Sequence, residues 1–207
     1  MMRDRRDFKI GILAEDLTDC RTLEVLVGRL LAVHGKTASF ARRGKDGCEH
    51  LMRKAKVWMA EMADAGCTAL LLVHDLDRDP ANRMLNKEPE LRRRIEQIPF
   101  PKGIARHICI PIEELEAWFW SCPSVLDRLA PGQGQSIVKS SPHLVNRPKE
   151  SLIRLSAGQH GGKARYTTQQ NPELAALLDL DLCARRCPAF RDLQTFVAES
   201  VAAASCI

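Results

Sequence analysis

"LLLVHDLDRDP", residues 70–80, is an apolar run that ends abruptly in three acids, Asp75, Asp77 and Asp79. A strand that is apolar at every position is buried on both faces, which is typical of a parallel sheet covered by helices. Carboxylates at the end of such a strand repel one another unless a cation, or a substitute from the protein or the solvent, lies beside them. This stretch therefore predicts a buried strand over 69–77 and suggests a cation site at its end.

The chain around this stretch alternates between strand and helix patterns. Further strands are predicted over 8–15, 37–43 and 103–112, and helices over 16–35, 48–66 and 89–98. The segment 123–165 is richer in Gly, Pro, Ser and Gln and is expected to form loops and short helices, and two helices broken at Pro188 are expected over 171–204. The alternation predicts an α/β fold with a mostly parallel sheet flanked by helices. We expect a core over 1–122 and a helical C-terminal extension over 123–207, packed together as one compact unit.

The composition is that of a globular protein. A chain of 207 residues can bury a proper core, and its 45% hydrophobic and 28% charged residues are ordinary proportions. No apolar stretch approaches the roughly 20 residues of a membrane helix, and "MMRDRRDFKIGILAED" lacks the apolar block of a signal peptide. We therefore expect a cytoplasmic protein with no membrane partner. The net charge of +5 is a mild bias toward polyanions.

The eight cysteines are scattered singly, without a C-x-x-C pair. Cys183 and Cys187 lie four residues apart, but no second pair of Cys or His completes a zinc-binding pattern. Buried free thiols, which behave as small apolar side chains, are the expected state of these residues.

Acidic residues stand at the ends of three predicted strands: Glu15, then Asp75 and Asp77, then Glu113. Ligands of parallel α/β sheets collect at the carboxyl ends of the strands. If "EELEAWFW" (113–120) begins an α-helix, Glu113 and Glu116 share one face of it. We therefore predict that Glu15, Asp75, Asp77, Glu113 and Glu116 converge, since Mg²⁺ and Mn²⁺ favour oxygen ligands. The alternative is a set of solvated acids at strand ends and a helix start.

Other residues near these strand ends have simpler interpretations. Asp16 or Thr18 is expected to cap the first helix, and Asp79, before a proline, to form a turn. His74, next to Asp75 on an alternating strand, is expected to point away from the acid pair. Trp118 and Trp120 are expected in the core rather than on a nucleobase.

Basic residues of the same region are candidates for binding phosphate. Arg42, Arg43 and Lys45 follow the second predicted strand, and Lys149 comes from a later loop. The alternative is ordinary surface charge.

The order of these motifs resembles a known domain. Glu15 followed by "DLTD", and "HDLDRD" after a buried strand, resemble the TOPRIM domain of type IA topoisomerases, bacterial primases and overcoming-lysogenization-defect nucleases. "IPIEELEAWFW", "RPKESLIRL" and "CPAFRDLQTFV" look more like a TOPRIM-related family of unknown function, often encoded beside ATPases in bacterial defence loci. That family often has an Asp a few residues after the tryptophan, where this chain has Ser121 and Cys122.

The resemblance implies a TOPRIM fold in which Glu15, Asp75 and Asp77 bind Mg²⁺ or Mn²⁺ and carry catalysis, with Glu113 and Glu116 as further ligands. It implies phosphodiester cleavage of DNA or RNA in a phage-defence system. The partners that we expect are nucleic acid, an ATPase and, as a homo-oligomer, further copies of the chain itself. Because the family's Asp is replaced here, the alternative function is a regulatory or interaction subunit of an ATPase complex that does not turn over substrate.

Overall fold

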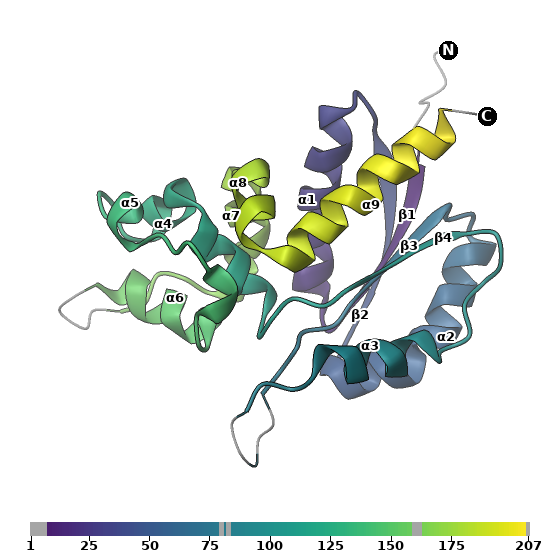
Figure 1. Ribbon diagram of the computed structural model, residues 1–207, viewed down its shortest axis with the longest axis horizontal. Coiled ribbons are helices and arrows are strands. Elements are labelled where there is room, and N and C mark those ends of the chain that lie inside the picture. The colour runs from purple at the N-terminus through teal and green to yellow at the C-terminus, as the bar shows by residue number, and fades with distance from the viewer. Residues whose placement is uncertain (1–7, 79–80, 82–83, 159–162, 206–207) are drawn as a thin grey trace.

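The chain forms a parallel sheet with helices on both faces (Figure 1). The structure is a computed structural model and describes residues 8–78, 81, 84–158 and 163–205. The strand order is β2-β1-β3-β4, and every pairing is parallel. The strands are β1 (Phe8–Ala14), β2 (Ala38–Gly44), β3 (Ala69–Val73) and β4 (Ala105–Cys109). The predicted α/β class and Rossmann-like arrangement are confirmed.

Two layers of helices cover the sheet, with α1 and α9 on one face and α2 and α3 on the other (Figure 1). These helices are α1 (Leu17–Val33), α2 (Gly47–Asp64), α3 (Glu88–Glu96) and α9 (Pro188–Ala204). The remaining helices are η1 (Leu115–Ser121, a 3₁₀ helix), α4 (Pro123–Leu129), α5 (Gly134–Ile137), η2 (Pro142–Leu144), α6 (Pro148–Ala157), η3 (Thr168–Gln170), α7 (Asn171–Leu177) and α8 (Leu180–Arg186).

Strand β3 is buried on both faces, as its continuous apolar run predicts. Leu71 and Val73 pack in the cluster formed with α1 and α9, whereas Leu70 and Leu72 pack in the cluster formed with α2 and α3. The side chains of a strand alternate between its faces, so an apolar residue is needed at every position here.

Strand β3 ends earlier than predicted, at Val73 rather than at residue 77. The N–H of His74 still donates to the carbonyl of Cys109, and that of Leu76 to the carbonyl of Pro111. Pro111 has no N–H to donate back to β3, so the regular ladder is interrupted at this point. Leu76 and Ile112 then make one isolated parallel bridge.

The segment after β4 also differs from the prediction, because no α-helix begins at Glu113. The N–H of Glu113 donates to the carbonyl of Leu76, and Glu113 has a positive φ of 63°. The chain is therefore still paired with the segment after β3 at this residue, and the 3₁₀ helix η1 starts only at Leu115. Glu113 and Glu116 consequently do not share a helix face, and that prediction is wrong.

The C-terminal part packs on α1 rather than standing apart from the sheet. Leu174 of α7 and Phe190 of α9 belong to the same buried cluster as Leu23 of α1. Trp118 meets Phe190 edge to face, with ring centroids 5.1 Å apart, and both tryptophans of the segment are buried as expected.

The helices that close the chain break at two places. The predicted break at Pro188 is confirmed, and a second break before α8 lies at Asp179, whose carboxylate caps that helix. None of the helices in the described ranges combines the length and the apolar character needed to cross a membrane.

Candidate metal centre

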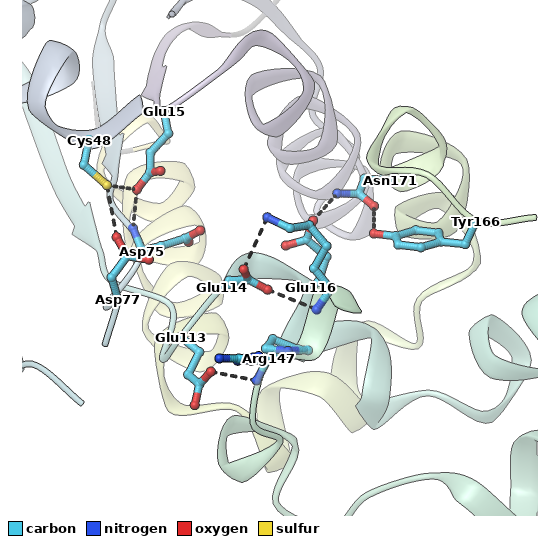
Figure 2. A network of polar contacts seen from close by, with 12 residues as sticks. Glu15, Cys48, Asp75, Asp77, Glu113, Glu114, Glu116, Arg147, Tyr166 and Asn171 are labelled. Atoms are coloured by element: carbon cyan, nitrogen blue, oxygen red, sulfur yellow. Dashed lines mark hydrogen bonds and ion pairs between the residues drawn. The ribbon is translucent and has the colours of Figure 1, made fainter. Parts of the chain in front are cut away.

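Carboxylates from the ends of β1 and β3 come together at the carboxyl edge of the sheet (Figure 2). Glu15 directly follows β1, and its Oε1 accepts a hydrogen bond from the backbone N–H of Asp75 at 3.2 Å. It also accepts a hydrogen bond from the thiol of Cys48, whose Sγ lies 2.7 Å away. Asp77 Oδ2 lies 3.2 Å from the same sulfur. Glu15, Asp75 and Asp77 are thus neighbours, as the strand ends predicted.

The local backbone explains why Glu15 and Cys48 meet. The N–H of Gly47, the first residue of α2, donates to the carbonyl of Glu15 at 3.1 Å. At Gly44, the end of β2, a Cβ would lie only 2.3 Å from the carbonyl oxygen of Asp16. A glycine at this position therefore allows the two chain segments to approach closely.

Asp75 and Asp77 do not point the same way. The side chain of Asp75 extends toward Glu116, whereas that of Asp77 turns toward Cys48 (Figure 2). The expectation that they share a direction depended on a strand through residue 77, and β3 ends before them.

Five carboxylates interact electrostatically here, and we call them the acid cluster: Glu15, Asp19, Asp75, Asp77 and Glu116. Burial, and then the charges of the other four members, raise the pKa of Asp75 well above its usual value. Burial, followed by the charges of Asp16, Glu116 and Glu15, raises the pKa of Asp19 to about 8. Within the part of the chain that the structure describes, the carboxylates of Asp19 and Asp75 accept no hydrogen bond and join no ion pair.

Glu116, on the side of the acid cluster nearest Asn171, is buried. Its Oε1 accepts a hydrogen bond from Asn171 Nδ2 at 3.0 Å, and Asn171 Oδ1 accepts one from the hydroxyl of Tyr166 at 2.7 Å (Figure 2). Burial raises the pKa of Glu116, although the Asn171 amide opposes the shift. The two hydrogen bonds that link Glu116 through Asn171 to Tyr166 fix the position of this carboxylate.

Glu113 faces away from the acid cluster. Its Oε1 accepts a hydrogen bond from Arg78 Nε at 2.6 Å, and its Oε2 accepts one from the N–H of Arg147 at 2.8 Å (Figure 2). The predicted convergence of the five acids is therefore wrong for Glu113, because the backbone pairing at Leu76 directs its buried side chain to Arg78 and Arg147 instead.

The basic residues at the end of β2 have acidic partners. Arg42 Nη1 lies 2.8 Å from Glu24 Oε2 of α1, and Arg43 Nη2 lies 3.1 Å from Glu61 Oε2 of α2. Lys45, at 3.7 Å from Asp46, is exposed. These pairs leave the first two side chains directed at helices rather than at the acid cluster.

Lys149 lies closer to the acids. Its N–H and Nζ contact the two oxygens of Glu114 at 3.0 and 3.3 Å. Burial opposes protonation of Lys149, but the charges of Glu114 and Glu116 outweigh it and raise the pKa to about 12. Lys149 therefore stays protonated near Glu116 of the acid cluster.

Two open pockets border this region and share Asp77. The pocket of about 470 Å³ contains Cys48, His74, Asp75 and Asp77, and basic side chains stand around it, namely Arg53, Lys87 and Arg94. The pocket of about 520 Å³ is lined by both charges, namely Asp77, Arg78, Glu113, Glu114, Asn146, Arg147, Glu150 and Arg154.

Three residues near the acids were missed or misplaced by the sequence analysis. Asp19 lies in the first turn of α1, and the only signal for it was the second acid of "DLTD". Cys48 is the second residue of α2, and the sequence alone gave no reason to distinguish it from the other cysteines. His74 was expected to point away, but its Nδ1 lies 3.8 Å from Glu15 Oε1 and it lines the same pocket as Asp75 and Asp77. Asp79 lies outside the described residues.

The ligand atoms of Glu15, Cys48 and His74 all lie within 4.8 Å of one another, so this group can hold a metal ion. Comparisons with protein-family models, curated proteins and solved structures found no match. The TOPRIM resemblance therefore stays a prediction.

Proposed function

We propose that the protein cleaves phosphodiester bonds of nucleic acid with Mg²⁺ or Mn²⁺ bound at the acid cluster. The observation that carries this proposal is the group formed by Glu15, Asp19 and Asp75. Two of its carboxylates have raised pKa values and lack hydrogen-bond donors or ion pairs among the described residues. A bound divalent cation would remove this repulsion. The donor set, consisting of oxygens, fits a hard cation.

In this proposal, Asp75 and Asp77 hold the ion from the segment after β3, with the Asp77 side chain turning from Cys48 toward Asp75. Glu116 completes the site from the side of Asn171. When bound, the ion would neutralise charge on the transferring phosphoryl group. Glu15 acts as a second ligand or as the general base. The N–H of Asp75 and the thiol of Cys48 hold its carboxylate in place.

The surroundings of the acids support a substrate that carries phosphates. The pocket that contains Asp75 and Asp77 is bordered by Arg53, Lys87 and Arg94, and the chain has a net charge of +5. A polyanion can bind to such cations while its scissile phosphate approaches the acids. Lys149 interacts electrostatically with Glu116 of the cluster, and Arg42, Arg43 and Lys45 are candidates for more distant contacts with the nucleic-acid strand.

The test is cleavage of plasmid DNA, single-stranded DNA and structured RNA in Mg²⁺ or Mn²⁺. Glu15→Gln preserves the size of the side chain but removes its charge, so cleavage should fall by roughly 10²–10⁴. Glu61→Gln, an exposed acid paired with Arg43, is the matched control and should cleave at the wild-type rate. A Glu15→Gln protein as active as wild type would remove Glu15 from the mechanism.

A second candidate function is a regulatory or interaction subunit of an ATPase complex. The observation that favours it is that acids next to the acid cluster already form salt bridges. Arg78 pairs with Glu113, and Lys149 pairs with Glu114. The TOPRIM-related family that the sequence resembles often has an Asp where this chain has Ser121 and Cys122. Ser121 is buried, and its hydroxyl donates to the carbonyl of Trp118. A wild-type protein that is inert on all three substrates, alone and with a neighbouring ATPase, would favour this function.

A further inference from the structure

Cys48 differs from the other cysteines that the structure describes. Cys20, Cys67, Cys109, Cys122, Cys183 and Cys187 are buried free thiols, whereas Cys48 is partly exposed in a pocket. Its sulfur lies 2.7 Å from Glu15 Oε1 and 3.2 Å from Asp77 Oδ2. A buried apolar thiol needs no such neighbours, so packing does not explain this position.

His74 supplies a third kind of donor to the same point. Its Nδ1 lies 2.8 Å from the backbone carbonyl oxygen of Asp75. In metal sites, such a contact holds the imidazole in place. The same Nδ1 lies 3.8 Å from Glu15 Oε1, so a small rotation of the ring away from the carbonyl would make it a ligand. The ring of His74 lies beside Glu15 and comes from the segment after β3. Cys48 comes from α2, and Glu15 directly follows β1.

The separations suit one ion. Zn²⁺ binds sulfur at about 2.3 Å and nitrogen or oxygen at about 2.0–2.2 Å in a tetrahedral arrangement, so donors on a common ion lie about 3.4–3.7 Å from one another. The donor atoms of Glu15, Cys48 and His74 lie within 4.8 Å of one another, and Asp77 Oδ2, outside that group, lies 3.2 Å from the Cys48 sulfur. Small side-chain movements are enough to bring these atoms onto one ion.

We propose that Glu15, Cys48 and His74, with Asp77 turning in as fourth ligand, form a second site, overlapping the first, for a thiophilic divalent ion of the Zn²⁺ class. Thiolate and imidazole favour Zn²⁺, whereas Mg²⁺ favours oxygen, so the two sites select different ions. On binding, the Cys48 thiol proton leaves to solvent, and no electron is transferred.

The two sites share Glu15 and Asp77, and this sharing gives Zn²⁺ a regulatory effect. An ion held by Cys48 and His74 would draw both carboxylates away from the hard cation. Zn²⁺ should therefore compete with Mn²⁺ and inhibit cleavage, a consequence that rests on the proposed function. Binding of Zn²⁺ itself does not rest on it.

Co²⁺ is a suitable probe, because a Co²⁺–thiolate bond gives a charge-transfer absorption that oxygen ligands do not give. Titration of the full chain with Co²⁺, without Mg²⁺, should produce this band with saturation at one equivalent, and Zn²⁺ should abolish it. Cys48→Ser should remove the band and weaken Zn²⁺ binding more than about 100-fold, beyond the ~10–100-fold effect of a lost supporting group. Cys67→Ser, a buried thiol elsewhere, is the matched control and should keep the band.

Further variants separate the two sites. Asp75→Asn should weaken Mn²⁺ binding but keep the Co²⁺ band, and His74→Gln should weaken Co²⁺ binding, with circular dichroism confirming that each variant is folded. The inference is overturned if wild type gives no band or if Cys48→Ser keeps it. It is also overturned if folded His74→Gln binds Co²⁺ as wild type does. Failure of Mn²⁺ to bind while the band persists would refute the proposed function but not this site.

Discussion

At the scale of single residues, Asp19 gives the clearest dependence on pH. Its folded-state pKa of about 8 lies above the usual value of 3.8, so the folded protein takes up protons that the unfolded chain has already released. The contribution of Asp19 to stability without metal should therefore be fully present below about pH 4, fall as pH rises from 4 to 8, and stay low above it. Asp75 and Glu116, whose pKa values are also raised, act in the same direction.

Asp19→Asn should accordingly raise stability at pH 8.5 by about 1–3 kcal/mol and make its fall with pH less steep. Thermal unfolding with EDTA at pH 5.5 and pH 8.5 measures both effects. Asp64→Asn, at the end of α2 and outside the acid cluster, is the control. Equal pH dependence in wild type and Asp19→Asn would contradict the assignment of a strained carboxylate.

The sequence indicates some residues of the site, because an apolar run that gives way to acidic residues marks the end of a strand. The neighbourhood of Glu15, Asp75 and Asp77 follows from parallel strands that end at one edge. The positions of Cys48 and His74 do not follow, since they depend on where α2 begins and on the early end of β3 at the Pro111 interruption. The direction of the Glu113 side chain, away from the acid cluster, depends on one backbone hydrogen bond to Leu76, which the sequence pattern does not predict.

At the scale of elements, the close approach of β2 to the start of α1 holds Glu15 in place. A Cβ at Gly44 would lie 2.3 Å from the Asp16 carbonyl oxygen, so Gly44→Ala should displace this loop and destabilise the protein by about 1–3 kcal/mol. Mn²⁺ binding should weaken too. Gly28→Ala on α1, where nothing lies within 4 Å, is the matched control and should be neutral or stabilising. Calorimetry and thermal unfolding of both variants check this, and equal effects would contradict it.

The alternation of strands and helices was predictable because apolar periodicity marks each element. The 3₁₀ helix η1 was not, since its apolar sequence suits an α-helix and only the pairing of Glu113 with Leu76 delays its start. The cap of α1 was predictable, and Asp16 Oδ1 accepts from the N–H groups of Thr18 and Asp19 at 2.6 and 2.9 Å.

At the scale of the whole molecule, the C-terminal helices complete the core. Leu23 and Leu26 of α1 pack in one cluster with Leu174 and Phe190. A fragment that ends at Cys122 would expose this face of α1, so it should aggregate or show no cooperative unfolding, whereas the full chain should unfold in one transition. Denaturant titration followed by circular dichroism compares the two. A monomeric fragment with a cooperative transition would mean that the core folds without the extension.

The most direct test of the proposed metal site is an anomalous-difference map from crystals of the protein soaked in Mn²⁺. We predict a peak between the carboxylates of Glu15, Asp75 and Asp77 in wild type, and its absence in crystals of Asp75→Asn. A wild-type map without a peak among these residues, in crystals that bind Mn²⁺ elsewhere, would contradict the assignment of the acid cluster as a divalent-cation site.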